Sequence, residues 1–327
     1  MEGDDLRLLR ERKGKTQGEF AAMLNNRLGR KYDRARVSRW ETGAERMPAD
    51  VGGLVALWRL SYPASGICTI ISVCNQKGGC GKTELSSAQA HVLASAGARV
   101  LLVDADLQAN ATMHVGIDMD ECARLTEEGR TLYHVLTRKS PVRSVIREST
   151  VPGLDVIPSS IALALAETEL AGTMSRMKDI LAEVRKDYDF VIIDCAPSLG
   201  IVTINSLTAS DKVLIPVQTE RYSIIGLGYL YTTISNVKEQ ANPTLSVLGV
   251  VPTMYNSRQT QDRLSLDDIN AAAGSYGFRV FEPVPRSTII AQACAADRIT
   301  LDADPGAPGL SSYIEIAQSL GVVRHGT

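Results

Sequence analysis

Short apolar runs recur along the chain from residue 70 onwards, and longer stretches with helical periodicity separate them. Apolar runs of this kind predict buried strands, and the periodic stretches predict helices that pack against them. The predicted strands are residues 70–74, 98–103, 154–160, 190–194, 212–217 and 245–252, and the predicted helices include 84–96, 130–137, 161–186 and 311–320. Strands that alternate with helices predict an α/β fold with a mostly parallel, doubly wound sheet.

The N-terminal part of the chain contains amphipathic helical stretches and no strand-like run. Residues 6–12 form the first of these stretches. Thr16 is a suitable N-cap for the next helix, and Glu19 completes a capping box with it. Asp33 can cap a further short helix over residues 34–41. The pattern therefore predicts a small all-α domain in front of the α/β domain.

Proline, glycine and other small residues interrupt the pattern at residues 61–66, which is typical of a linker. We expect an all-α domain over residues 1–62, a linker over 63–66 and an α/β domain over 67–327. Residues 1–62 carry 13 Lys and Arg against 9 Asp and Glu, a net charge of +4, whereas the rest carries 22 against 28, a net charge of −6. A basic domain on an acidic one indicates contact with nucleic acid.

The composition excludes several classes of protein. With 44% hydrophobic and 22% charged residues, the chain has the composition of an ordinary globular protein. It has no apolar run of the roughly 18 residues that a membrane span needs, and its first residues lack the apolar core of a signal peptide. The six cysteines form no C-x-x-C pair, which argues against a zinc site or a disulfide framework. We expect a cytoplasmic protein that binds no membrane.

The sequence IISVCNQKGGCGKT, residues 70–83, places a glycine-rich turn between a predicted strand and a predicted helix. Backbone N–H groups of such a turn can surround oxyanions, and the helix dipole adds partial positive charge. Lys82 would reach the β- and γ-phosphates of a nucleotide, and the Thr83 hydroxyl would ligate Mg²⁺. The expected nucleotide-binding residues of the turn and the start of the helix are Gly78, Gly79, Cys80, Gly81, Lys82, Thr83 and Glu84. The turn therefore predicts a P-loop that binds ATP with Mg²⁺.

Two other predicted strands end in acidic residues. Asp104 and Asp106 follow the strand at 98–103, and Asp194 ends the strand at 190–194. Carboxylates at the carboxyl end of a parallel strand lie in the crevice where nucleotides bind. We expect Asp194 to hold Mg²⁺ through water, because magnesium gives up its waters reluctantly. The predicted metal site consists of Thr83, Asp106 and Asp194, and a surface turn is the alternative for the segment around Asp104.

The glycine-rich turn departs from the ordinary P-loop, which has a glycine where this chain has Gln76. The chain has instead K-G-G-x-G-K-T, with a second lysine, Lys77, in front of the glycines. This motif resembles the deviant Walker A motif of the ParA/MinD ATPases. In that family the additional lysine contacts nucleotide phosphates across a dimer interface, so the resemblance implies a homodimer.

Residues 104–111 resemble the D-x-D-P-Q-x-N-A switch element of the same family, with Leu107 in place of the proline. The resemblance implies that Asp106 positions the attacking water and that Asp104 bonds to the shell around Lys82 and Mg²⁺. The catalytic residues implied in this way are Lys77, Lys82, Asp104 and Asp106.

Two late loops, residues 253–258 and 283–286, flank the adenine if the resemblance to the family extends to them. Met254, Asn256 and Pro285 are then candidate contacts to the base, and plain loop packing is the alternative. Arg258 and Arg286 lie in the same loops and are candidates for non-specific contact with DNA.

The N-terminal pattern T-Q-x-x-x-A followed by V-S-x-W-E-x-G resembles the helix-turn-helix domain of the Cro/lambda-repressor type. In that fold the second helix of the motif enters the major groove. The candidate DNA contacts are Gln17, Arg34, Arg36 and Arg39, because an arginine can bond guanine O6 and N7 together. The alternative is that these arginines form an ordinary solvated face.

Together the two resemblances imply an ATP-dependent DNA partition protein associated with the nucleoid. Its ATP-gated dimer would bind DNA non-specifically, a ParB-like centromere-binding protein would stimulate hydrolysis, and the N-terminal domain would repress the operon. The alternative is a transcriptional regulator that uses the ATPase domain as a ligand switch. Membrane-directed positioning lacks a C-terminal amphipathic anchor, and an iron–sulfur reductase would need a cysteine pair at the dimer axis.

Overall fold

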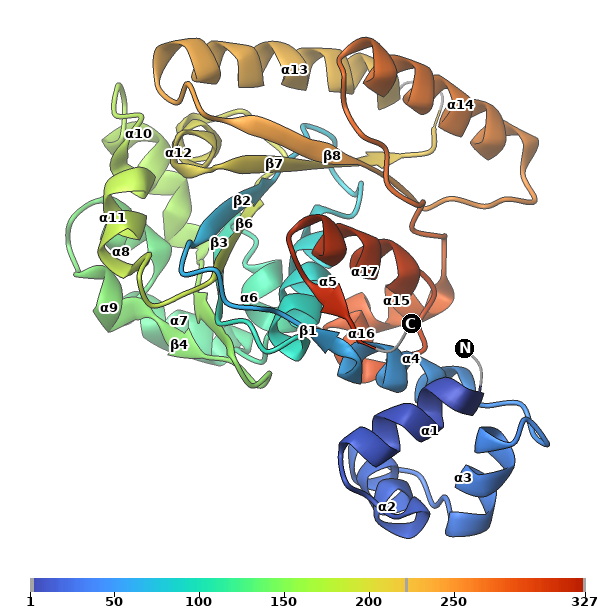
Figure 1. The fold of residues 1–327 in the computed structure, drawn as a ribbon. Coiled ribbons are helices and arrows are strands. Elements are labelled where there is room, and N and C mark those ends of the chain that lie inside the picture. The colour runs from blue at the N-terminus through green and yellow to red at the C-terminus, as the bar shows by residue number, and fades with distance from the viewer. Residues whose placement is uncertain (1–2, 221–222, 326–327) are drawn as a thin grey trace.

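The computed structural model describes residues 3–220 and 223–325, and a seven-stranded sheet forms its centre (Figure 1). In spatial order the strands are β4 (Arg147–Glu148), β5 (Leu154–Ile157), β3 (Val100–Ala105), β6 (Phe190–Cys195), β2 (Thr69–Val73), β7 (Lys212–Gln218) and β8 (Ser246–Thr253). β4 pairs antiparallel with β5, and the other neighbouring strands pair in parallel. The predicted α/β fold with a mostly parallel sheet is confirmed.

Helices cover both faces of the sheet. One face packs against α5 (Lys82–Ser95), α6 (Asn110–His114), α7 (Met119–Glu127), α16 (Thr300–Ala303) and α17 (Leu310–Ser319). The other packs against α8 (Leu132–Leu136), α9 (Val142–Val145), α11 (Arg176–Val184), α12 (Ile201–Ala209), α13 (Ser223–Gln240) and α14 (Thr260–Ser275). Because side chains alternate along a strand, Ile71 and Val73 of β2 join the first cluster and Ile70 joins the second.

The predicted strands agree with the observed ones to within a few residues, and the stretch with helical periodicity at 161–186 is helical in separate pieces. It consists of η1 (Ile161–Leu165), α10 (Ala166–Glu169) and α11. Gly172 lies between the last two with a φ of 78°, a left-handed conformation that interrupts a right-handed helix.

The N-terminal helices have a hydrophobic cluster of their own. They are α1 (Gly3–Arg12), α2 (Gln17–Leu28), α3 (Arg34–Glu41) and α4 (Ala49–Trp58). The predicted capping box is present, since Glu19 N donates to Thr16 Oγ1 and Thr16 N donates to the Glu19 carboxylate. Asp33 caps α3 by accepting from Arg36 N. Phe20 and Trp40 are the largest buried side chains in this cluster.

Helix α4 connects this cluster with the core of the α/β part. Its residues Val51 and Leu54 belong to the N-terminal cluster, whereas Ala56 and Leu57 belong to the cluster under α5. A Cβ added at Gly53 would lie 1.8 Å from the carbonyl oxygen of Pro305, so the two backbones are in direct contact. The N-terminal helices therefore dock on the segment that carries α15 (Thr288–Ala295) and α16 (Figure 1).

The chain leaves α4 through a short strand, and the predicted linker at 63–66 follows this strand. β1 (Leu60–Ser61) pairs antiparallel with β9 (Val323–Arg324), and Tyr62 N donates to Ala96 O. Arg59 is buried, and its guanidinium donates to His325 O and pairs with Asp5. These contacts hold the N-terminal helices and the C-terminus together.

Candidate nucleotide-binding site

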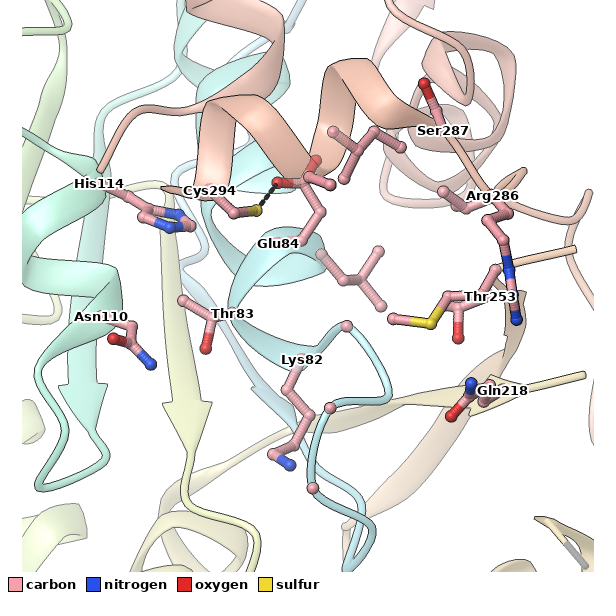
Figure 2. A pocket seen from close by; sticks show the side chains of 18 of the residues that line it. Lys82, Thr83, Glu84, Asn110, His114, Gln218, Thr253, Arg286, Ser287 and Cys294 are labelled. Atoms are coloured by element: carbon pink, nitrogen blue, oxygen red, sulfur yellow. Dashed lines mark hydrogen bonds between the residues drawn. The ribbon is translucent and has the colours of Figure 1, made fainter. Parts of the chain in front are cut away.

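A cavity of about 870 Å³ opens where β2, β3, β6, β7 and β8 end (Figure 2). The glycine-rich turn and α5 form one side, and the loop after β8 and helix α15 form the other. The lining residues include Gly78, Gly79, Gly81, Lys82, Thr83, Asp106, Gln108, Asn110, Pro197, Gln218, Glu220, Met254, Pro285, Arg286, Ile290, Ala291 and Cys294. The cavity therefore brings together three of the motifs that the sequence places far apart.

The glycine-rich turn takes the conformation expected of an anion-binding loop. Gly79 and Gly81 have φ values of 70° and 88°, which a residue with a side chain rarely adopts. Cys80 between them is fully buried, and its carbonyl oxygen accepts from Thr253 Oγ1 at 2.8 Å, so the turn is tied to β8. Lys82 opens α5, and its ammonium donates to the carbonyl oxygen of Lys77 at 3.0 Å. These two bonds fix the glycine-rich turn against β8 and against the start of α5.

Thr83 and Asp194 lie next to each other at the end of β6. The Thr83 hydroxyl donates to one carboxylate oxygen of Asp194 and the Ser86 hydroxyl donates to the other, both at 2.8 Å. Burial raises the pKa of Asp194, while the two hydroxyl donors oppose this effect. A cation at this position would favour the charged carboxylate.

The donors at this place fit magnesium. Mg²⁺ is usually held by one or two carboxylates together with substrate phosphates, and a threonine hydroxyl is its usual P-loop ligand. Thr83 and Asp194 supply such a set, and Asp106 lines the cavity close by. Within residues 3–220 and 223–325 no cluster of three or more His, Cys, Asp and Glu side chains forms an all-protein metal site.

The carboxylate of Asp104 is held by residues that follow it closely in the sequence. Its carboxylate accepts from Thr112 N at 2.8 Å, from Thr112 Oγ1 at 2.7 Å and from Asp106 N at 3.1 Å. The expected bond to the shell around Lys82 and Mg²⁺ stays a prediction, and in this structure the Lys82 ammonium donates to the carbonyl oxygen of Lys77. Burial and the adjacent charge of Asp194 raise the pKa of Asp104. Asp104 holds the loop that presents Asp106.

Asp106 lines the cavity, as its motif predicts. It is nearly buried, and one carboxylate oxygen accepts from Gln108 N at 3.1 Å. Gln108 and Asn110 also line the cavity, although sequence reasoning assigns them no role. Their places in the same switch segment are the signal that could have identified them.

The two late loops are joined to each other and contribute unequally. Tyr255 N donates to Val284 O, and Arg286 N donates to Tyr255 O, so the loops run side by side. Met254 and Pro285 line the cavity. Asn256 is not among the lining residues, and its side-chain oxygen accepts from Arg258 N at 3.1 Å, so its contact to the base stays a prediction.

Arg286 and Arg258 have different surroundings. Both side chains are exposed, but Arg286 lines the cavity whereas Arg258 lies on the surface of the preceding loop. A cavity-facing position makes Arg286 a potential phosphate or base contact in addition to the DNA contact that the sequence suggests.

Glu84 is among the residues expected to bind nucleotide, and its carboxylate has other partners instead. It accepts from Thr300 Oγ1 at 2.8 Å, from Tyr313 OH at 3.2 Å and from Cys294 Sγ at 3.5 Å. Figure 2 shows the carboxylate turned towards Cys294 and away from Lys82. Sequence reasoning misses α15 as a wall of the cavity, because residues 287–309 carry no motif.

Lys77 precedes the glycine-rich turn, and its side chain points to Glu220, which lines the cavity. Its ammonium lies 2.5 Å from Glu220, which follows β7. Gln218 also donates to the Glu220 carboxylate. The lysine is 38% exposed and the glutamate 49% exposed, so the pair is accessible to solvent and to a partner.

The four candidate DNA contacts in the N-terminal helices have different surroundings. Arg36 and Arg39 both donate to the Glu45 carboxylate, at 2.8 and 2.9 Å, and Arg34 is exposed on the same helix. The side chain of Gln17 donates instead to Glu41 at 2.7 Å. This bond links the start of α2 to the end of α3, and a contact of Gln17 with DNA stays a prediction.

No helix in the part of the chain that the structure describes is long and apolar enough to cross a bilayer.

Comparison with known proteins agrees with this geometry. The family described as an AAA domain (AAA_31) matches residues 68–247, a segment that begins after helices α1–α4. The sporulation initiation inhibitor protein Soj of Bacillus subtilis is 40% identical over 258 residues, covering 77% of this chain and 97% of Soj. The chromosome partitioning protein ParA of Caulobacter vibrioides is 36% identical over 257 residues, covering 77% of this chain and 93% of ParA.

A solved structure shows the same fold at similar identity. It is described as cobyrinic acid a,c-diamide synthase from Mycobacterium smegmatis with bound ADP and magnesium. It is 34% identical with a TM-score of 0.65, and the match covers 77% of this chain and 93% of that chain. The fold, the glycine-rich turn and these relatives lead to one conclusion: the chain belongs to the ParA/MinD-type P-loop ATPases.

Proposed function

We propose that this chain is an ATP-dependent DNA partition protein that works as an ATP-gated homodimer. The observation that carries the proposal is the combination of the Lys77 turn with the Thr83–Asp194 pair, in a chain similar to Soj and ParA. The chain is an ATPase that hydrolyses ATP to ADP and phosphate.

The two ends of the cavity suit the two ends of ATP. Backbone N–H groups of the glycine-rich turn and the ammonium of Lys82 bind the phosphates at one end. Met254 and Pro285 offer an apolar contact to the base at the other. Thr83 and Asp194 hold Mg²⁺, which neutralises charge on the phosphates when bound.

Asp106 is the residue proposed to orient the attacking water. The water oxygen forms a bond to the γ-phosphorus, and the bond to the oxygen that bridges the β- and γ-phosphates breaks. Asp106 lines the cavity, and Gln108 N fixes one of its oxygens, so its other oxygen remains for water. Because positioning and electrostatics dominate phosphoryl transfer, the role of this chain is to hold the reacting groups in line.

Lys77 is proposed to act on the nucleotide of a second copy. Its own ammonium points to Glu220 rather than to the near side of the turn. A cation supplied in trans can raise the rate of phosphoryl transfer by roughly 10³-fold or more. Dimerisation would thus depend on ATP.

The N-terminal residues 1–62 are proposed to form a helix-turn-helix domain that reads an operator through α3. Arg34, Arg36 and Arg39 lie on this helix, and the domain would repress the operon of the chain. Non-specific DNA would bind the ATP dimer, with Arg258 and Arg286 as candidate contacts. This places the protein on the nucleoid in the cytoplasm, next to a ParB-like centromere-binding partner.

The test is ATP turnover with and without the predicted partners. The purified chain is assayed alone, with random DNA, and with DNA plus a centromere-binding protein encoded by a neighbouring gene. We expect turnover to rise several-fold only when the partner and DNA are both present. A turnover rate that the partner leaves unchanged would favour a regulator in which ATP acts as a ligand.

A further inference from the structure

We propose that Glu84 is a positioning residue for the nucleotide base, because it anchors α15, one wall of the cavity, to the first turn of α5. The proposal rests on the assignment of the cavity to ATP. It concerns a residue that stands two positions after the P-loop lysine but turns its side chain away from the phosphates.

The carboxylate of Glu84 connects four helices through hydrogen bonds. Glu84 itself lies in the first turn of α5, and its three donors come from α15 (Cys294), α16 (Thr300) and α17 (Tyr313). Glu84 and Tyr313 are 8% and 1% exposed, and Thr300 is fully buried. Buried donors that lose their acceptor are costly, so the three helices are held to α5 at this point.

Helix α15 is only partly buried, and Ile289 and Ile290 pack against the core cluster under α5. Ala293 is its buried residue, and its other side chains are intermediate or exposed. The segment from residue 286 to residue 309 contains no strand of the sheet. The bond from Cys294 to Glu84, and the bonds that fix α16 and α17 beside it, therefore act together with this packing to set how far α15 lies from α5.

The distance between α5 and α15 matters for the base and not for the phosphates. Ile290, Ala291 and Cys294 of α15 line the same cavity as Met254 and Pro285. In Figure 2, Ser287 and Cys294 lie across Glu84 from Lys82. A shift of α15 would loosen the contact to a flat apolar base and leave the turn unchanged. Glu84 should thus affect nucleotide affinity more than the rate of turnover.

The experiment compares binding of two probes by calorimetry in the presence of Mg²⁺. One probe is a slowly hydrolysed ATP analogue, and the other is inorganic tripolyphosphate, which has the phosphates without the base. The variants are Glu84→Ala, Glu84→Gln, Tyr313→Phe and Thr300→Val. Thr208→Val is the matched control, because Thr208 is a buried threonine whose hydroxyl bonds only within α12.

We expect Glu84→Ala to weaken binding of the ATP analogue by about tenfold or more, since two buried hydroxyl donors and the Cys294 thiol lose their acceptor. Glu84→Gln should recover part of this loss because its amide oxygen still accepts. Tyr313→Phe and Thr300→Val should each cost a smaller factor, and they keep the test valid if Glu84→Ala does not fold. Binding of tripolyphosphate and the kcat at saturating ATP should change by less than about threefold.

Two results would overturn the positioning role. Equal loss of both probes would mean that Glu84 acts on the phosphate end, and unchanged binding of the analogue in all four variants would mean that α15 needs no such anchor. A wild-type chain that binds tripolyphosphate but gains no affinity from the base would instead refute the assignment of the cavity to ATP.

Discussion

Lys77 and Glu220 form an ion pair beside the cavity, with the ammonium 2.5 Å from the carboxylate. Both side chains are more than a third exposed, and exposed ion pairs contribute only about 0.2–1 kcal/mol. Lys77 is therefore held by its own chain weakly enough to exchange Glu220 for a nucleotide phosphate of a second copy.

This relationship predicts opposite effects for the two residues. Lys77→Ala should bind ATP as a monomer and fail to dimerise, because its charge is not needed for the near side of the turn. Glu220→Gln should dimerise at least as well as the wild type, with a gain of no more than about fivefold for each of the two pairs that the dimer would release, which corresponds to about 1 kcal/mol per pair. Light scattering with a slowly hydrolysed ATP analogue measures both, and Lys178→Ala on α11 is the control for a lost surface charge. A normal nucleotide-dependent dimer of Lys77→Ala would rule out the trans role.

Alanine substitutions of Lys82 and Asp106 should have different effects on ATP binding and turnover. Lys82 supplies charge to the phosphates before and during the reaction, so Lys82→Ala should lose ATP binding. Asp106 is proposed to orient water, so Asp106→Ala should bind ATP, turn over at least about 100-fold more slowly and accumulate as a dimer. Equilibrium binding and turnover of both variants decide the matter. If Asp106→Ala loses ATP binding as completely as Lys82→Ala, the water-orienting role is wrong.

The buried His91 should lower the free energy of unfolding of the protein in acid. It is buried on α5, its charged neighbours are Asp302 and Arg27, and burial lowers its pKa to about 4. The unfolded chain, with a pKa near 6.5, binds more protons between these values. The free energy of unfolding should therefore fall as pH decreases from about 6.5 to 4, by up to about 3 kcal/mol from this residue.

Urea unfolding at pH 7.5, 6 and 5 tests this expectation. His91→Leu keeps an apolar side chain of similar size and removes the titration, so its stability should depend less on pH than that of the wild type. Equal pH dependence of the two proteins would show that His91 does not contribute to acid sensitivity.

Arg36 and Arg39 should affect recognition of DNA and not hydrolysis of ATP. Glu45 holds both guanidinium groups at the surface of α3, where a base edge would replace the carboxylate. A bidentate arginine contact is worth roughly 1–3 kcal/mol of discrimination. Arg36→Ala should thus lower the ratio of specific to random DNA binding by about fivefold or more, measured by fluorescence anisotropy on DNA upstream of the gene. An unchanged ratio in both Arg36→Ala and Arg39→Ala would support the solvated-face interpretation of α3.

Point variants are better suited to this test than removal of the N-terminal helices. Ala56 and Leu57 belong to the core cluster under α5, and β1 pairs with the C-terminal β9. A chain that begins after residue 62 would lose these core residues. Loss of DNA binding in such a chain could then result from a damaged α/β part.

The fold and the phosphate end of the site could be predicted from the sequence because their signals are local. The glycine-rich turn comes shortly after β2, and Asp194 is the next-to-last residue of β6 and pairs with Val73, so parallel strand order alone brings the turn and the carboxylate together. Helix α4 is not predicted because two glycines interrupt its periodicity and Pro48 supplies no side-chain cap.

The base end of the site could not be predicted in the same way. The partners of Glu84 lie more than 200 residues away in the sequence, on helices without a motif. The role of Asp104 depends on the direction of its side chain, and Thr112 determines that direction from the next helix. The pairing of Arg36 and Arg39 with Glu45 depends in the same way on how the chain turns after α3.

The central claim is that ATP gates the binding of DNA by a dimer, and one titration tests it most directly. Binding of random DNA is followed by fluorescence anisotropy for the wild type and for Lys77→Ala, with ATP, with ADP and without nucleotide, across salt. Each neutralised phosphate adds about 0.9 to the slope of log K against log salt, so a dimer with doubled contacts should lose affinity steeply between about 50 and 200 mM salt. We predict tight binding only for the wild type with ATP. Equally tight binding without nucleotide, or by Lys77→Ala with ATP, would contradict the account.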